Sequence, residues 1–334
     1  MPAAPSRAIV HIGAHKTGTT YLQRVLHTLR PALRETGVAF PSRWIQSEDQ
    51  PSHQLLYAAL TDNTTDALRA DLVAQAADLL LISSEDLVYL QEPQIQSLRG
   101  FLGDAGVTIV FHCRRWSEIM PSVWQERIKH GFSETFPQFA TAALADPHRL
   151  DFIQFGAVLD RYAAVFGKSA IRIVCYNAVS DIAVHFLETF LPAQAGLLEK
   201  AGPMLRSRPN RSLPPVQTEI VRVLNLIHRA HDGAQGSAVR EWFLRDGQRY
   251  DLTRLSGPIQ THLTTLRLND AAPVLDAIHQ RLWAEYRDCV VDPHPADGFF
   301  TPMSRDIPYA DPRYLADPAI RQQYDALYGA FRAA

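Results

Sequence analysis

The chain has 334 residues, of which 46% are hydrophobic and 20% are charged, and its formal net charge is −2. This length and composition predict a soluble globular protein of one large or two ordinary domains. The small net charge excludes a global basic field for nucleic acid or an anionic membrane, so any anion site must be local. No stretch reaches the ~18 apolar residues of a membrane span, and the opening residues MPAAPSR lack the apolar core of a signal peptide. We therefore expect a cytoplasmic protein that has no transmembrane segment and binds no nucleic acid.

The three cysteines, Cys113, Cys175 and Cys289, are far apart in the sequence and form no C-x-x-C pair. Two of them lie in apolar runs that look like strands. This pattern predicts buried, reduced thiols rather than a disulfide framework or a zinc site. Lysine is rare, and Lys16, one of only four lysines, lies inside a glycine-containing loop. This position makes Lys16 a candidate functional residue.

The first predicted elements are a strand, a loop and a helix, in that order. An apolar run at residues 8–12 leads into a loop from Gly13 to Thr20, and apolar residues then recur at helical spacing through residues 21–36. Glycines let successive backbone N–H groups turn toward an anion, and the helix N-terminus adds the positive end of its dipole. The order therefore predicts a loop that binds a phosphate or sulfate group.

The next part of the chain continues the alternation of strands and helices. Further strands are expected at residues 38–41, 79–82, 107–111 and 170–176, and helices at residues 54–60, 66–77, 93–102, 117–129, 152–166 and 181–191. This alternation predicts an α/β fold with a doubly wound, mostly parallel sheet flanked by helices. The run at residues 79–82 ends in Ser83, Ser84, Glu85 and Asp86. Ligands of open α/β sheets bind at the carboxyl ends of strands, so these polar residues are candidates for a site.

The composition changes in the last part of the chain. Arg206, Arg208 and Arg211 cluster in the segment RSRPNRSLPP, which predicts either a mobile lid over an anionic ligand or a solvated linker. Helical patterns follow at residues 216–231, 272–286 and 319–331. We expect no strand among them. The sequence thus predicts an α/β core at residues 7–195 and, at residues 196–334, an arginine-rich loop with a helical extension that caps the core.

The letters of the first loop distinguish it from the loop of nucleoside-triphosphate-binding proteins, G-x-x-x-x-G-K-[ST]. Gly13, Gly18 and Thr20 match that pattern. Thr19 occupies the lysine position, however, and the lysine lies earlier, at Lys16. The sequence HKTGTT resembles the 5′-phosphosulfate loop of sulfotransferases that use 3′-phosphoadenosine 5′-phosphosulfate (PAPS). An ordinary strand–helix turn with two glycines is the alternative.

A second motif adds to this resemblance. PAPS differs from ATP in its 3′-phosphate, which an arginine and a hydroxyl group would bind. In sulfotransferases these groups lie at a strand end and eight residues later, in runs resembling R-N-P-x-D-x-x-x-S. Arg114 and Ser122 match this spacing, and Glu118 stands for the acidic residue. Arg115 and Trp116 replace Asn-Pro, and an exposed arginine pair followed by a surface serine is the alternative.

The resemblance covers residues 8–213 and extends to bacterial sulfotransferases of carbohydrates or glycoconjugates. Residues 152–176 are similar to the helix and strand that precede a Y-E-D-L-like turn in those proteins, and residues 210–213 read N-R-S-L as theirs do. The turn itself differs, because Asn-Ala-Val follows Tyr176, so we assign it no role. The resemblance implies the P-loop NTPase-like fold of sulfotransferases.

The resemblance also implies roles for individual residues. The cofactor-binding residues would be His15, Lys16, Thr17, Gly18, Thr19, Thr20, Arg114, Ser122 and Arg211. Lys16 would also act in catalysis, by balancing charge on the bridging oxygen of the phosphosulfate. Glu85 would deprotonate the acceptor, with His53 as the alternative base. Glu85 could instead cap a helix, a place for which Asp86 competes. PAPS is then the co-substrate, 3′,5′-adenosine bisphosphate (PAP) is the product, and the scheme requires no metal.

The leading interpretation is a PAPS-dependent sulfotransferase that acts on a hydroxyl group of a small molecule or glycan. A P-loop kinase is the second, because residues 79–85 could form the strand that ends in a Mg²⁺-binding acid. A nucleotide-binding module without catalysis is the third. The acceptor and the oligomeric state stay open, because acceptor sites in such folds are built from variable loops.

Overall fold

The computed structural model describes residues 5–74, 77–191, 196–202, 213–233, 235–291 and 298–334. The chain divides into two compact units. The first comprises Met1–Arg115, His148–Pro209 and Pro273–Thr301, and the second comprises Trp116–Pro147, Asn210–Ala272 and Pro302–Ala334. This division differs from the expected boundary at residue 195, because each unit collects segments from both sides of it. Arg206, Arg208 and Arg211 lie outside the described residues.

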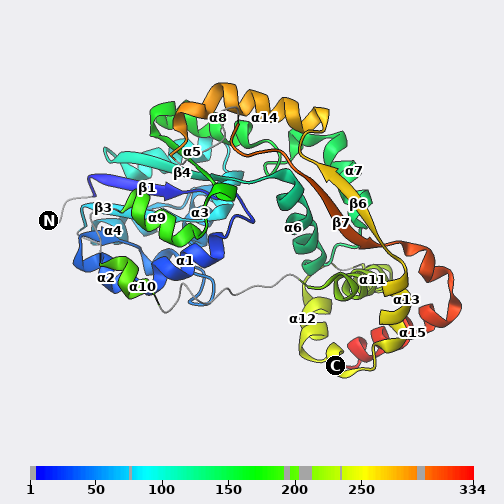
Figure 1. The fold of residues 1–334 in the computed structure, drawn as a ribbon. Coiled ribbons are helices and arrows are strands. Elements are labelled where there is room, and N and C mark those ends of the chain that lie inside the picture. The colour runs from blue at the N-terminus through cyan, green and yellow to red at the C-terminus, as the bar shows by residue number, and fades with distance from the viewer. Residues whose placement is uncertain (1–4, 75–76, 192–195, 203–212, 234, 292–297) are drawn as a thin grey trace. The chain divides into compact units, whose positions relative to one another are not determined.

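The first unit contains a five-stranded parallel sheet, which confirms the predicted α/β class. Its strands are β1 (Arg7–His11), β2 (Val38–Ala39), β3 (Leu79–Ser83), β4 (Gly106–Cys113) and β5 (Ile171–Cys175). Their order in the sheet is β2-β3-β1-β4-β5, with every pair parallel. All five residues of β3 are buried, as expected for a parallel strand covered on both faces. The central strand β1 is therefore flanked by β3 and β4 (Figure 1).

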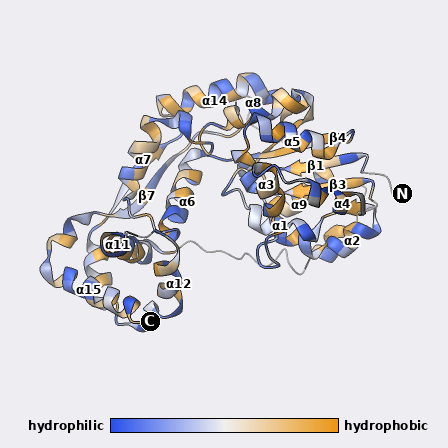
Figure 2. Cartoon of the chain, turned by 180° about the vertical axis from the view of Figure 1, so that it is seen from behind, coloured by the Kyte–Doolittle hydropathy of each residue, from blue (hydrophilic) through white to orange (hydrophobic). Residues whose placement is uncertain are grey.

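Helices cover both faces of this sheet. The helices of the first unit are α1 (Thr19–Thr28), α2 (Arg30–Glu35), α3 (Gln54–Thr61), α4 (Asp66–Ala74), α5 (Glu92–Leu102), α8 (Phe155–Phe166), α9 (Ile182–Phe190), α10 (Leu197–Ala201) and α14 (Pro273–Tyr286). On one face, Leu22 of α1 and Phe186 of α9 pack on Ile9 of β1. On the other, Phe155 of α8 contacts Phe111 of β4 edge to face, with ring centroids 5.3 Å apart. Figure 2 shows hydrophobic residues gathered on the strands between these helices.

The second unit is mainly helical but contains a sheet of its own. Its helices are α6 (Trp116–Lys129), α7 (Phe136–Ala145), α11 (Pro215–Asp232), α12 (Ala238–Arg245), α13 (Thr253–Thr261) and α15 (Pro318–Arg332). Strands β6 (Leu263–Asn269) and β7 (Ser304–Ala310) pair antiparallel. The expectation of no strand in this part of the chain was therefore wrong. β6 and β7 are mostly exposed, so they lack the continuous apolar run that identifies a buried strand.

Two further expectations can be compared with the structure. The three cysteines are buried and free, as their apolar surroundings predict. None of the described helices has the length and apolar character that crossing a membrane would require.

Candidate functional site

The candidate site lies at the carboxyl edge of the parallel sheet. β1 leads into the glycine loop, β3 leads into Glu85, and β4 leads into Arg114. The ends of β1 and β3 are level, because His11 is in register with Ser83, whereas β4 continues beyond the partner of His11, Val110, to Cys113. The chain runs from β1 to β2 and β3 on one side and then to β4 on the other. Such a change of direction is where open α/β sheets bind their ligands.

The loop from Gly13 to Gly18 needs glycine at both ends. Gly13 has φ 101° and Gly18 has φ 77°, in the left-handed region that side chains disfavour. A Cβ atom on Gly13 would lie 3.3 Å from the Cα of Glu85, and one on Gly18 would lie 3.2 Å from Cγ2 of Ile182. Thr17 Oγ1 donates to the carbonyl of Ala14 at 2.5 Å and closes the turn. The loop is therefore a close-packed backbone turn that ends at the N-terminus of α1.

Lys16 lies at the turn of this loop, as the sequence predicts. It adopts φ 63°, a left-handed conformation that costs a non-glycine residue about 1–2 kcal/mol. The side chain is half-buried. A residue kept in such a conformation is a candidate for function.

Arg114 contacts the loop from the end of β4. Its Nη1 donates to the carbonyl of Lys16, and its guanidinium carbon lies 5.0 Å from the ring centroid of Tyr176. Tyr176 follows β5 and also lies beside Gly18. Arg114 thus supports the conformation of the loop. Tyr176 was not predicted as a site residue. Its position at the end of a predicted strand was the signal that could have identified it.

Ser122, the predicted partner of Arg114, belongs to the second unit. There its Oγ donates to the carbonyl of Glu118 at 3.1 Å, one turn earlier in α6. The pairing of Arg114 with Ser122 around a 3′-phosphate stays a prediction. The predicted contribution of Arg211 lies outside the described residues.

Glu85 lies directly against the loop, because its Cα is the nearest atom to a Cβ placed on Gly13. Its Oε2 accepts a hydrogen bond of 2.5 Å from Nε2 of Gln23 in α1. Glu85 is half-buried, whereas Gln23 is only 2% exposed. Gln23 was not predicted. Its signal is a polar residue next to Leu22 on the buried face of an amphipathic helix.

A second acid–amide pair follows immediately. Asp86 Oδ2 accepts from Nε2 of Gln54 at 2.6 Å, and its Oδ1 lies 3.6 Å from Nε2 of His15. Burial raises the pKa of Asp86, the neighbouring His15 and Gln54 oppose this effect, and the charge of Glu85 adds to it. The His15 ring lies 5.1 Å from the half-exposed ring of Tyr89. His15 is thereby linked to the acids at the end of β3.

His53, the alternative base, lies in the interior of the first unit. Its ring is fully buried, Nδ1 accepts from the backbone N–H of Ser83 at 2.9 Å, and Nε2 donates to the carbonyl of Pro41 at 3.1 Å. Burial lowers the pKa of His53 to about 3, more than the bond to Pro41 raises it. Both ring nitrogens thus join backbone segments, and His53 is a structural residue of the core.

Two more buried histidines lie beneath the loop. His11 at the end of β1 and His112 in β4 are both fully buried, with ring centroids 4.5 Å apart. His11 Nδ1 is 2.8 Å from Oγ of Ser83. The backbone of His112 holds the loop, because its N–H donates to the carbonyl of Gly13 at 2.7 Å. Burial lowers the pKa of both rings, to about 3 for His11, so these histidines are neutral at pH 7.

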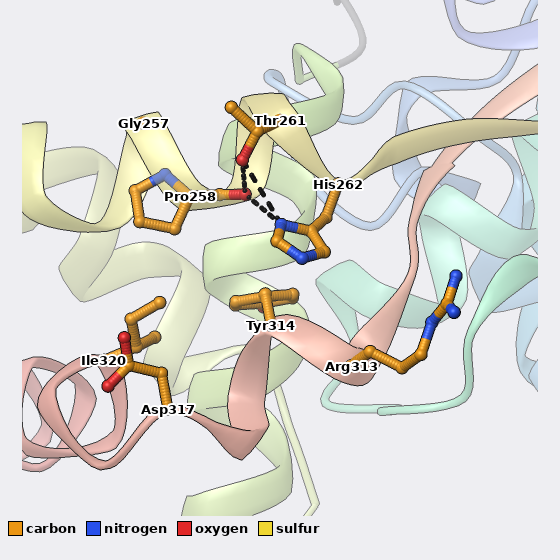
Figure 3. Close-up of a pocket in the computed structure, with 8 residues that line it drawn as sticks. All are labelled: Gly257, Pro258, Thr261, His262, Arg313, Tyr314, Asp317 and Ile320. Atoms are coloured by element: carbon orange, nitrogen blue, oxygen red, sulfur yellow. Dashed lines mark hydrogen bonds between the residues drawn. The ribbon is translucent and has the colours of Figure 1, made fainter.

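A separate cavity of about 460 Å³ lies within the second unit, between α13 and the start of α15 (Figure 3). Several of its polar groups already bind neighbours. His262 Nδ1 donates to the carbonyl of Pro258 at 2.9 Å, and Asp317 accepts from the N–H of Ala319 at 2.8 Å. Arg313 bonds Asp311 at 2.6 Å. This cavity contains none of the predicted site residues, and we assign the candidate site to the sheet edge of the first unit.

The sheet edge therefore combines a backbone turn suited to an anion, a lysine and an arginine on that turn, and a carboxylate beside it. Thr17 and Thr19 are buried in the turn and Thr20 is half-buried. Such an arrangement can bind a phosphate or sulfate group and place an acid–base residue next to it. A scan against protein-family models, a search of curated proteins and a search of solved structures found no match to this chain.

Proposed function

We propose that this protein is a PAPS-dependent sulfotransferase that transfers the sulfuryl group to a hydroxyl acceptor of a carbohydrate or glycoconjugate. The observation that carries the proposal is the meeting of Lys16, Arg114 and Glu85 at one glycine turn. Gly13 and Gly18 let the backbone turn tightly against Glu85 and Ile182, and a glycine turn before a helix N-terminus is suited to an anion. The strand order β2-β3-β1-β4-β5 differs from the 3-2-1-4-5-6 order of dinucleotide-binding folds and the 2-1-3-4-5 order of flavodoxin-like folds.

In the proposed reaction the acceptor oxygen forms a bond to sulfur, and the bond from sulfur to the 5′-phosphate oxygen breaks. Glu85 accepts the proton of the acceptor hydroxyl. Lys16 and the N–H groups at the start of α1 stabilise the negative charge that develops on the departing phosphate oxygen. PAP, the sulfated acceptor and a protonated Glu85 result. The chain contributes positioning and charge, which are the main requirements of such a group transfer.

A P-loop kinase is the second candidate, because two acids follow the buried strand β3 beside the loop and could hold Mg²⁺. The place of Lys16 within the loop, before Gly18, argues against it. A nucleotide-binding module without catalysis is the third, and an assay for sulfated product distinguishes it.

The test is calorimetric binding of PAP, 5′-AMP and ATP without Mg²⁺, and of ATP with Mg²⁺, together with detection of PAP released from PAPS in the presence of a panel of sugars. We expect PAP to bind at least about tenfold more tightly than AMP, since a charge-assisted contact with the 3′-phosphate contributes 1.5–3 kcal/mol. Arg114 also holds the Lys16 carbonyl, so Arg114→Ala can disturb the loop itself. The ratio of PAP affinity to AMP affinity measures the contribution of the 3′-phosphate alone. We expect this ratio to fall close to one in Arg114→Ala. Preference for ATP with Mg²⁺ would support the kinase instead.

A further inference from the structure

Two glutamine–carboxylate pairs lie side by side after β3. Gln23 Nε2 donates to Oε2 of Glu85 at 2.5 Å, and Gln54 Nε2 donates to Oδ2 of Asp86 at 2.6 Å. Although the two acids are consecutive, their partners come from different helices. Gln23 belongs to α1, which starts at the glycine turn, and Gln54 begins α3. Both pairs join a glutamine amide to a carboxylate, but the first connects the end of β3 to α1 and the second connects it to α3.

We infer that Gln23 is a positioning residue for Glu85, fixing one carboxylate oxygen so that the other, Oε1, receives the proton of the acceptor. This inference rests on the proposed function of Glu85 as the base. A carboxylate has two equivalent oxygens, and a side chain that rotates freely presents them in many orientations. The bond from Gln23 removes that freedom. It also connects the base to the helix whose N-terminus is proposed to bind the phosphate.

The burial of Gln23 supports this role. At 2% exposure its amide has little competition from water, which strengthens a hydrogen bond to a charged acceptor. Gln23 lies one turn after Thr19, the first residue of α1, so a shift of the glycine turn moves its amide as well.

A purely structural role is the competing explanation, and the test separates the two. Gln23→Met keeps the length and packing of the side chain but removes the donor, and Gln54→Met makes the same change in the neighbouring pair. Labelling of carboxyl groups by a water-soluble carbodiimide, mapped by mass spectrometry, reports the state of each acid without any substrate. The kcat and KM of PAP release from PAPS, measured with an acceptor sugar from the panel, report the position of the base during turnover.

We expect Gln23→Met to speed labelling of Glu85 several-fold, while Gln54→Met affects Asp86 and leaves Glu85 unchanged. Turnover by Gln23→Met should fall about tenfold or more, since misplacing a catalytic group by 1 Å costs as much as about 10²-fold. The loss should lie in kcat, and KM for PAPS should change little, because a misplaced base slows the reaction without removing the contacts to PAPS. PAP affinity should stay within about twofold of the original value, because the phosphate contacts remain.

Other results would overturn the inference. Unchanged labelling of Glu85 would show that Gln23 does not hold it, and unchanged turnover with faster labelling would show that the contact does not serve the reaction. If Gln23→Met unfolds, Gln23→Glu, which keeps the size of the side chain but replaces the donor amide with a carboxylate, is used in its place, and faster labelling of Glu85 with reduced turnover is then expected. Absence of PAP binding or of PAPS turnover in the unchanged protein would remove the proposed function and the positioning role together, whereas the labelling would still establish the contact.

Discussion

The two units bury different kinds of polar side chain. In the first unit, His11 and His112 beneath the glycine turn are fully buried, as is His53, and burial lowers the pKa of each of these three rings. The second unit buries Glu219 and Arg222, each 3% exposed, which bind each other through two hydrogen bonds of 2.7 Å. A buried charge needs a partner inside the protein. A charged side chain near the surface, above uncharged histidines, can instead be balanced by a bound ligand.

The buried charges of the second unit are closely satisfied. Tyr314 donates to Glu219 at 2.6 Å, its oxygen lies 3.0 Å from the Tyr324 hydroxyl, and Arg222 also donates to the carbonyl of Ser133 at 2.8 Å. Burial lowers the pKa of Arg222, but the hydrogen bonds and charge of Glu219 raise it more, so the net shift is upward. This cluster holds α11 to η8 (Pro312–Ala316) and α15. The comparison leads us to expect that the buried ion pair contributes to stability, whereas the half-buried Lys16 contributes to the proposed anion binding.

Lowering the pH should give the largest effect on stability, and this effect should come from the buried histidines of the first unit. The pKa of His11 and of His53 is lowered to about 3 by burial, so between about pH 6.5 and 3 only the unfolded chain binds these protons. Stability is therefore present above pH 6.5 and is lost as the pH falls, by about 1.4 kcal/mol per pH unit for each histidine. Urea unfolding between pH 7.5 and 5 measures this slope. His53→Asn should reduce the slope by one histidine, and His130→Asn, whose side chain is 62% exposed, should not.

Removing one charge of the buried pair should give the next largest effect. Arg222→Met leaves Glu219 unpaired in the interior, so we expect the free energy of unfolding to fall by about 3–5 kcal/mol. Urea unfolding at pH 7 measures the loss. The double variant with Glu219→Leu should be more stable than Arg222→Met alone, because it removes the glutamate that would otherwise lack its positive partner. If PAP binding by the folded protein also changed, the proposed separation of roles would be wrong.

Lys16→Met tests a charge that is half-buried at the candidate site rather than fully buried in an ion pair. Loss of this cation should lower PAPS turnover by about 10²- to 10³-fold, the usual effect of removing one group that stabilises developing charge. The free energy of unfolding should change little, because the side chain is half-buried at the surface of the turn. PAP release and urea unfolding, measured on the same preparation, give both quantities. A large loss of stability with unchanged turnover would contradict the assignment.

The smallest effect is expected at the cavity of the second unit. Asp317 caps α15 by accepting from the N–H of Ala319, and Asp317→Ala should cost about 1 kcal/mol. Thermal unfolding measures this change. PAP affinity should be unaffected, and a change in it would connect the cavity of Figure 3 to the nucleotide site.

The sequence predicted those parts of the fold that depend on short-range patterns. The buried strands, the glycine turn and helices such as α11 were found within one or two residues, because continuous apolar runs and helical spacing are local signals. The placing of Glu85 beside Gly13 followed from one rule, that the carboxyl ends of parallel strands converge.

What the sequence could not predict depends on contacts between distant residues. His53 looked like a loop residue, but Pro41 and Ser83 bind its two nitrogens. Gln23 finds Glu85 across 62 positions of the chain. The strands β6 and β7 bury few side chains, and the assignment of segments to two units follows only from packing.

The interleaving of the two units has a consequence for how the protein is made. The first unit ends its last segment at Thr301, and this segment supplies α14, which packs on α8, and Val290, which pairs with Ile173 at the open side of β5. During synthesis on the ribosome the sheet can begin to form early, but its edge and one helical cover arrive only after most of the chain has emerged. The two units are therefore expected to mature together, late in translation, and a nascent chain stopped at residue 195 should depend on chaperones.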